Sequence, residues 1–283
     1  MNVLYERAQR IEAEENLDPA ANKVADAVSK VLSAGPVKDL LSGTWLGHSL
    51  HPLLTDVPIG TWTSATMLDL FGGEETRAAA RRLVGLGILA SLPTAASGLS
   101  DYSDTYGPER RVGVVHAALN TIALGLFGGS YMARRRGSDG AGKVLGLAGM
   151  GVASLGAYLG GHLSLDMGIG VDHTAYEAGP NEWTPVLDDS EVGEGEARKV
   201  EAQGASIMVA RHRGRLCALA DRCTHLGGPL HEGKMEDGTV TCPWHGSVFG
   251  LDDGRVVRGP ARSPQPAFDA RVAEGRIEIR RRS

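Results

Sequence analysis

Hydrophobic and polar positions are distributed unevenly along the chain. Residues 83–100, 112–133 and 144–165 contain no Asp, Glu, Lys or Arg. The second and third of these segments have 22 residues each. At about 1.5 Å per residue, a helix of that length spans the roughly 30 Å of a bilayer's hydrocarbon core. The segments also lack the charged face of an amphipathic helix in a soluble bundle. The pattern therefore predicts membrane-spanning helices.

A further apolar segment covers residues 52–71 and is interrupted by Asp56 and Asp69. We count it as a span, which makes a four-helix transmembrane domain over residues 41–173. Glycines four residues apart, Gly125 with Gly129 and Gly156 with Gly160, allow helix backbones to approach closely in lipid.

Polar sequence lies on both sides of this domain. Residues 1–40 are predicted to form an amphipathic helical tail, with an apolar stripe at Val24, Ala27, Val28, Val31 and Leu32. After a linker at 174–182, short alternating stretches and the turn pairs Arg213-Gly214 and Glu274-Gly275 predict antiparallel hairpins over residues 183–283. The predicted fold class therefore has two parts, a four-span α-helical bundle and an all-β domain.

Overall composition hides this division. The chain has 283 residues, 42% of them hydrophobic, and a net charge of −5; its mean hydropathy of −0.12 is that of a soluble protein. Residues 181–283 contain 16 acidic and 15 basic side chains. This balance gives no cationic excess for nucleic acid, so we expect no nucleic-acid partner.

The most specific motif is "CTHLGGPLHEGKMEDGTVTCPWHG", residues 223–246. Cys223 and His225 form C-x-H, and Cys242 and His245 form C-x-x-H, with 16 residues between the pairs. Zinc is one candidate, but zinc sites usually use paired cysteines or paired histidines at other spacings. A Rieske cluster is the other, because it needs two thiolates for one iron and two imidazoles for the second.

The segments "CTHLGGPL" and "CPWHGSVFGLDDGRV" resemble the two cluster-binding loops of Rieske iron–sulfur proteins, and the likeness runs from about Trp183 to Arg281. The resemblance implies a 2Fe-2S cofactor. It also implies that Cys223 and Cys242 hold the inner iron, while His225 and His245 hold the outer iron.

The sequence differs from high-potential members of that family at positions that affect the reduction potential of the cluster. Their additional loop cysteines, which form a disulfide, are replaced here by Gly228 and Trp244, and a tyrosine that donates to a cluster-binding sulfur is replaced by Phe249. Ser247, another usual donor, is kept. Fewer hydrogen bonds stabilise the reduced cluster less, so we expect a potential in the lower part of the roughly −150 to +300 mV Rieske range.

The helical half resembles a bacterial predicted-membrane-protein family of unknown function with four spans. The residues that carry this likeness are "GTWLGHSLHPLLTDVPIGTW", "HAALNT" and "YLGGHL", within residues 37–173. The resemblance supplies a fold expectation and no activity.

Loop charges predict the orientation in the cell membrane. Seven basic residues follow the first and third spans: Arg77, Arg81, Arg82, Arg134, Arg135, Arg136 and Lys143. The other side has Lys38, Arg110 and Arg111 near the spans. The positive-inside rule then predicts a multi-pass protein whose N-terminus and Rieske domain share the extracytoplasmic side.

Histidines in the predicted bundle form a second candidate site. His51, His116 and His162 fall in the leaflet that faces the Rieske domain, and His48 precedes His51 by about one helical turn. Ionisable groups in a membrane are costly and commonly functional. The candidates are ligands of haem b, a site for another metal or a quinone head group, or histidines that only hydrogen-bond to neighbouring groups.

These observations predict a membrane-bound electron-transfer protein, an oxidoreductase component rather than a complete stand-alone enzyme. Its electrons would pass to or from a redox partner protein or quinone. One alternative is a membrane-anchored ferredoxin that serves an oxygenase or another enzyme, and another is a redox sensor module. A Rieske oxygenase with its own iron is a further rival, for which Asp166, His162 and His173 are the only local ligand set.

Overall fold

The structure is a computed structural model that describes residues 3–282. The chain divides into two compact units. The helical unit comprises the chain up to Leu32 together with Leu50–Ile169, and the β unit comprises Ser33–Ser49 together with the chain from Gly170. The first limit differs from the predicted boundary at residue 40, because residues 33–49 pack with the β unit, and the second lies four residues before the predicted boundary at residue 173.

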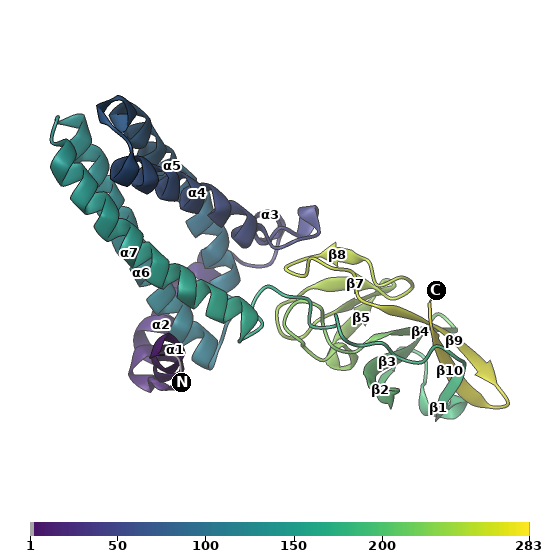
Figure 1. Cartoon of the computed structure of the whole chain (residues 1–283). Helices are drawn as coiled ribbons and strands as arrows, with labels where there is room; N and C mark the ends of the chain where they lie inside the picture. The colour runs from purple at the N-terminus through teal and green to yellow at the C-terminus, as the bar shows by residue number, and fades with distance from the viewer. Residues whose placement is uncertain (1–2, 283) are drawn as a thin grey trace. The chain divides into compact units, whose positions relative to one another are not determined.

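The helical unit consists of four long helices and two shorter ones that precede them (Figure 1). Their bounds are α1 (Val3–Ala13), α2 (Asp18–Val31), α4 (Leu50–Phe71), α5 (Arg77–Tyr102), α6 (Gly107–Arg135) and α7 (Asp139–Leu165). Short 3-10 turns, η1 (Glu15–Leu17) and η3 (Glu74–Thr76), precede α2 and α5.

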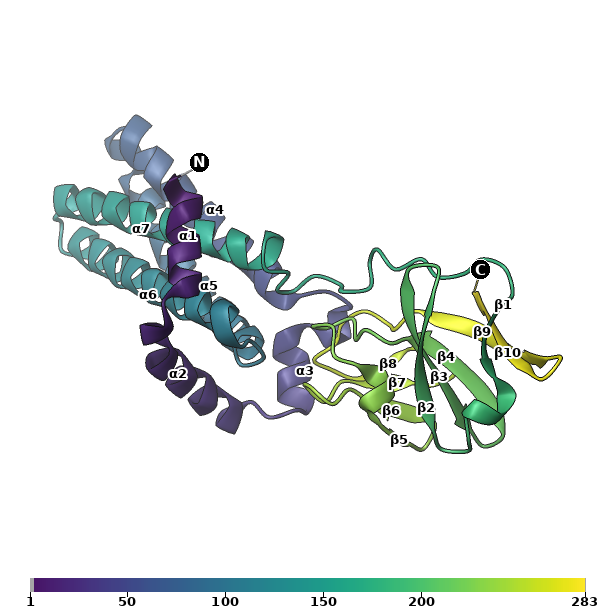
Figure 2. The ribbon, with the colours of Figure 1, turned by 90° about the horizontal axis from the view of Figure 1, so that it is seen from below.

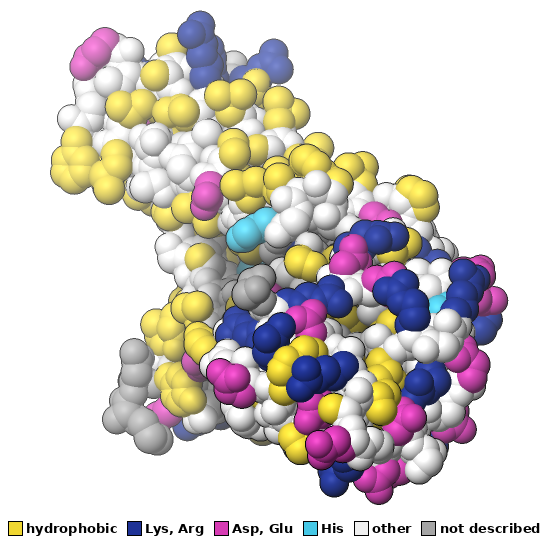
Figure 3. All heavy atoms as spheres, turned by 90° about the vertical axis from the view of Figure 1, so that its right-hand side faces the viewer, with side chains coloured by type: hydrophobic (Ala, Val, Ile, Leu, Met, Phe, Trp, Pro, Cys, Tyr) yellow, Lys and Arg dark blue, Asp and Glu magenta, His cyan; other side chains and the backbone are white. Residues whose placement is uncertain are grey.

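Within residues 3–282, three helices are long and apolar enough to cross a membrane: Glu74–Tyr102, Gly107–Arg135 and Asp139–Leu165. The predicted first span, α4, is not among these three candidates because Asp56, Asp69 and several hydroxyl side chains lower its hydropathy. In the upper part of Figure 3, hydrophobic side chains are spread over the visible face, and a group of Lys and Arg side chains lies at its upper end.

The charge that interrupts α4 is paired inside the helical unit. Asp69 accepts two hydrogen bonds from the Arg134 guanidinium of α6, one of them 2.9 Å from Nη1 to Oδ1. The two side chains are 5% and 1% exposed. Lys143 of α7 donates to the Asp69 carbonyl at 3.1 Å. Because the Arg134 guanidinium pairs with it, the Asp69 carboxylate does not carry the full cost of an isolated buried charge.

The apolar stripe predicted for the N-terminal tail is not the packing face of α2. Val31 is 80% exposed and Val24 37% exposed, whereas Ala21 and Ala25 are fully buried. Tyr102 of α5 donates to the Ala21 carbonyl at 2.9 Å. A contact this close needs the smallest side chains, so the helix turns its alanines inward. The structure therefore has a helix where the apolar stripe predicts one, and the stripe itself is largely exposed.

The β unit contains two antiparallel sheets (Figures 1 and 2). The six-stranded sheet has the order β1-β10-β9-β4-β3-β2, and the four-stranded sheet has the order β5-β6-β7-β8. The strands are β1 (Thr184–Asp188), β2 (Ala197–Ala202), β3 (Ala205–His212), β4 (Arg215–Ala220), β5 (Lys234–Glu236), β6 (Thr239–Thr241), β7 (Val248–Gly250), β8 (Val256–Arg258), β9 (Ala267–Ala273) and β10 (Arg276–Arg281). A short helix α3 (Pro36–Ser42) and the 3-10 turns η2 (Thr44–Leu46), η4 (Asp189–Glu191) and η5 (Leu230–Glu232) complete the unit.

Both predicted hairpin turns are confirmed. Arg213-Gly214 joins β3 to β4 and Glu274-Gly275 joins β9 to β10, each with positive φ at both positions. This is the geometry of a type I′ turn, whose twist matches that of the strands.

Alternation along β3 and β4 divides their side chains between two cores. Ile207 and Val209 face one core, whereas Met208 and Leu219 face a second that also contains Cys223, Cys242 and Phe249. Because side chains alternate along a strand, one face of β3 and β4 contributes the apolar side chains that pack with the two cysteines.

Candidate iron–sulfur site

Two short loops with the same backbone arrangement position the Cys/His motif. The N–H of Cys223 donates to the Gly228 carbonyl at 2.9 Å, and that of Cys242 donates to the Ser247 carbonyl at 2.8 Å. Each bond spans five residues. Gly227 and Gly246, the fifth residue of each loop, have φ of 77° and 74°, a conformation that glycine adopts at low cost. The glycines are therefore required by the turn itself.

Backbone amides surround both sulfurs. The N–H groups of His225 and Leu226 hydrogen-bond to the Cys223 sulfur, and those of Trp244 and His245 to the Cys242 sulfur. The two thiols are 1% and 2% exposed. The hydrogen bond that they share lowers the pKa of Cys242 to about 7 and raises the pKa of Cys223, whereas the amide donors act to lower the pKa of both cysteines. Donors of this kind favour a thiolate, which is the form that ligates metal.

The two motif histidines lie side by side. Their ring centroids are 5.0 Å apart and their planes are nearly perpendicular, at 85°. His225 is 7% exposed, and burial places its pKa well below the usual range. A neutral imidazole is the ligating form, so the site holds His225 in the state that iron requires.

The donor set fits two irons better than one zinc. A single zinc needs its ligands about 2.0–2.3 Å from one point. Across residues 3–282, no three His, Cys, Asp or Glu side chains converge in this way. The motif side chains instead form a thiol pair and an imidazole pair, the division that a two-iron cluster requires.

Gly228 and Trp244 are neighbours in space, as the resemblance implies for the positions of the missing disulfide. An ideal Cβ on Gly228 would lie 3.0 Å from the indole Cγ of Trp244 and 2.8 Å from the Cys242 sulfur. The indole, 54% exposed, therefore packs against the glycine backbone.

Ser247 and Gln265 support the loops from behind. The Ser247 hydroxyl, fully buried, accepts from the Ala261 N–H at 2.9 Å, so its own proton is available to another acceptor. Gln265 is 1% exposed and accepts from the Thr224 N–H at 3.1 Å. Sequence reasoning missed Gln265, because a polar residue in a proline-rich turn reads as solvent-exposed loop.

His51 and His116 come together in the helical unit. Their ring centroids are 6.4 Å apart at 84°. His51 Nδ1 bonds to the Thr94 carbonyl at 2.9 Å, and His116 Nδ1 bonds to the Gly156 carbonyl at 2.8 Å. Each histidine is thus oriented by a backbone carbonyl of another helix.

The other two predicted histidines have different surroundings. His162 contacts Glu12 through Nε2 at 2.6 Å and Asp166 through Nδ1 at 2.9 Å, so carboxylates engage both ring nitrogens. His48 belongs to the β unit and bonds to the Ser49 carbonyl at 3.2 Å.

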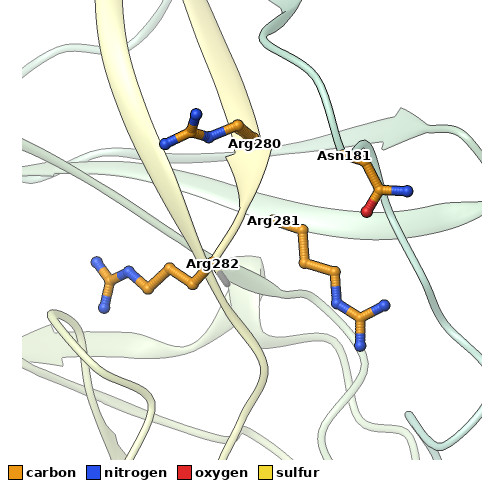
Figure 4. A pocket seen from close by; sticks show the side chains of 4 residues that line it. All are labelled: Asn181, Arg280, Arg281 and Arg282. Carbon is orange, nitrogen blue, oxygen red and sulfur yellow. The ribbon is translucent and has the colours of Figure 1, made fainter.

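A hollow of about 490 Å³ on the β unit is lined by Asn181, Arg280, Arg281 and Arg282 (Figure 4). Arg280 and Arg282 extend to the side of β10 opposite Arg281, and both pair with Asp269, at 3.2 and 3.1 Å. These bonds lower the pKa of Asp269. None of the predicted site residues lines this hollow.

Two cysteine–histidine loops on a double-sheet domain define an iron–sulfur protein, here joined to a helical part with membrane-spanning character. Comparison with known proteins gives the families. Residues 182–269 match the Rieske [2Fe-2S] domain, and residues 47–173 match the family described as Predicted membrane protein (DUF2231).

Several curated relatives share the β unit. Ferredoxin CarAc of Metapseudomonas resinovorans is 31% identical over 98 residues, which are 34% of this chain and 92% of the ferredoxin. The 3-phenylpropionate/cinnamic acid dioxygenase ferredoxin subunit of Photorhabdus laumondii is 37% identical over 90 residues, 31% of this chain and 85% of that subunit. Apoptosis-inducing factor 3 of Mus musculus is 30% identical over 86 residues, 30% of this chain, but the chain spans only 14% of its length.

The chain therefore belongs to the Rieske [2Fe-2S] family through its β unit, and it joins that domain to a DUF2231 predicted membrane protein domain.

Replacing Gly228 with alanine should disrupt the site, because the new Cβ would overlap the Cys242 sulfur and the Trp244 ring. Overpacking of this kind costs about 1–3 kcal/mol. Iron and acid-labile sulfide per protein, measured after purification, should fall by about half or more. Gly193→Ala is the matched control, since its Cβ would have no neighbour nearer than 3.4 Å. Full cluster content in Gly228→Ala would contradict the described loop geometry.

Proposed function

We propose that this protein is a membrane-bound electron-transfer protein, an oxidoreductase component. In this proposal Cys223 and Cys242 hold the inner iron of a 2Fe-2S cluster, and His225 and His245 hold the outer iron. The observation that carries the proposal is the pair of matching loops, each with two N–H groups directed at its cysteine sulfur.

The loops perform three tasks in this proposal. Amide donors offset negative charge on the sulfurs, apolar neighbours such as Phe249 exclude water from the thiolates, and Ser247 is placed to donate its hydroxyl proton. The cluster, when bound, supplies one-electron transfer. Because Phe249 has no hydroxyl, one donor found in high-potential relatives is absent at that position.

Electron paramagnetic resonance of the reduced, detergent-purified protein tests the ligand assignment. We expect the g-tensor of a cluster with two-histidine ligation. Cys223→Ala, Cys242→Ala and His245→Ala should each abolish this signal, because each removes an iron ligand. Film voltammetry should give a potential in the lower part of the roughly −150 to +300 mV range.

Cys217→Ala is the control for the cysteine variants, since Cys217 is also buried in the β unit but lies outside the loops. It should retain the signal. A potential above about +200 mV would contradict the predicted effect of Phe249, and an intact signal in His245→Ala would contradict the ligand set.

We further propose that α4 crosses the membrane as a fourth span. Its support is antiparallel packing along α5: Trp62 donates to the Val84 carbonyl at 3.3 Å and Thr94 donates to the Leu54 carbonyl at 3.2 Å. A helix paired along the length of a spanning helix shares its depth. Four spans place the N-terminus and the Rieske domain on one side of the membrane.

The proposed side is extracytoplasmic, from the excess of basic residues in the opposite loops. Arg134 contributes little to that excess because Asp69 neutralises it, but Arg135 and Arg136 are exposed. Protease added to intact cells should therefore cleave the Rieske domain, as detected by antibody. Cleavage only after lysis would contradict the proposed orientation and indicate that the Rieske domain lies on the cytoplasmic side.

A second redox site at His51 and His116 is also proposed, for a haem or a quinone head group. Ligating histidines commonly donate their other N–H to a carbonyl, as both do through Nδ1. Small residues flank both rings: a Cβ on Gly98 would lie 2.7 Å from His51, and one on Gly160 would lie 3.0 Å from His116. His162 is left out because carboxylates engage both of its ring nitrogens.

Optical spectra and extracted-quinone analysis of the purified protein test this site. A haem should give a Soret band that shifts on reduction, and a bound quinone should be recovered in the extract. Either signal should be lost in His116→Ala and kept in His48→Ala. Absence of both signals in the unsubstituted protein would contradict the second site. The similarity to ferredoxins would then favour the alternative function, a membrane-anchored ferredoxin.

A further inference from the structure

The short helix α3 and the turn η2, both part of the β unit, bury polar side chains and expose apolar ones. Lys38 and Ser42 are 4% and 0% exposed, whereas Val37, Leu40 and Trp45 are 60%, 56% and 64% exposed. A helix on the surface of a soluble domain normally buries its apolar face. Here the polar face is inside.

Three hydrogen bonds hold that polar face on the β unit. Asp39 accepts from the Gly259 N–H at 3.0 Å, and Thr44 donates to the Ala261 carbonyl at 3.1 Å. Arg262 Nε donates to the Ser42 carbonyl at 2.6 Å. Figure 2 shows α3 beside the part of the β unit that contains β6, β7 and β8.

The contact requires a glycine and adjoins the candidate cluster site. An ideal Cβ on Gly259 would lie 2.7 Å from the Asp39 carboxylate oxygen, so a larger residue would separate the two segments. Ala261 also donates its N–H to Ser247 of the second cluster loop. The polar face of α3 is therefore fixed on the turn that supports that loop, and its apolar face is directed away.

The outward face also lacks charge. Lys38 and Asp39 are the only Asp, Glu, Lys or Arg residues between Ser33 and Ser49; Lys38 is buried and Asp39 bonds to Gly259. Trp45 satisfies its indole N–H on the Leu40 carbonyl at 3.1 Å, which leaves the ring as apolar surface. Exposed apolar side chains that are grouped in this way, with no charge among them, favour an interaction site.

Chain continuity identifies the occupant. The match to the predicted membrane protein family begins at residue 47, directly after η2, and α4 begins at Leu50. Tryptophan is enriched where membrane helices meet the headgroups, and amphipathic helices lie in that layer with their apolar side toward the acyl chains.

We propose that α3 and η2 form a membrane foot, defined by Val37, Leu40 and Trp45, that inserts into the bilayer interface and holds the Rieske domain at the lipid surface. This inference rests on the proposed membrane function. It deepens that function because a cluster-binding domain held at the lipid surface would exchange electrons with a membrane-bound or lipid-soluble partner.

Tryptophan quenching in phosphatidylcholine vesicles tests the foot with the full-length, cluster-loaded protein. The difference in emission between the unsubstituted protein and Trp45→Phe isolates Trp45. We expect this component to be quenched about twofold more by lipid brominated near the glycerol backbone than by lipid brominated near the chain end, and to be shielded from aqueous iodide.

Leu40→Gln should weaken bromolipid quenching of Trp45 and expose it to iodide. Val272→Gln, at a residue of β9 that is 46% exposed, is the matched control and should change neither. An unchanged cluster signal in each variant establishes that the β unit is folded.

Washing the membranes with carbonate distinguishes a failure of the proposed membrane domain from a failure of the membrane foot. Release of the protein by carbonate would contradict the proposed membrane domain. Retention with Trp45 open to iodide and insensitive to bromolipid would overturn the foot alone. Retention with Trp45 shielded from both quenchers would also overturn it, because a protein surface would then cover this face.

Discussion

The Rieske half of this protein depends on the closure of two loops by a backbone hydrogen bond from a cysteine N–H to the carbonyl five residues later. Each closure turns a glycine into the left-handed region and directs two further amides at the cysteine sulfur. The same turn brings a histidine of each loop beside its counterpart. The pairing of the two thiols and of the two imidazoles thus follows the backbone geometry of the loops, and apolar residues of the sheets pack against the cysteines.

A different constraint governs the helical half, where a polar group that would lie in lipid must find a partner within the protein. Asp69 meets Arg134, and His51 and His116 each bond to a carbonyl of another helix. The glycines between the helices make these contacts possible: at Gly142, a Cβ would lie 2.5 Å from the Arg134 side chain. Close backbone approach and polar satisfaction are therefore two aspects of the same packing.

Residues 33–49 combine a polar face that packs on the β unit with an exposed apolar face. They precede the first long helix in sequence but pack with the β unit, through a polar face fixed on the turn next to a cluster loop. Their apolar face is left on the outside. An exposed apolar face of this kind is suited to contact with a surface less polar than water.

The sequence by itself determined the two-part architecture, the hairpin turns and the four residues of the Cys/His motif, because charge-free runs, turn pairs and metal-ligand spacing are local properties. It predicted a fourth span that hydropathy does not single out, since Asp56 and Asp69 count against α4. The partner that neutralises Asp69 lies 65 residues away in the chain. Only the tertiary structure decided which face of α2 packs, that His51 meets His116 while His162 meets carboxylates, and that Gln265 supports a loop. Apart from the contact of His162 with Asp166 four residues later, these contacts join segments distant in the chain, and their pairing depends on how the elements dock.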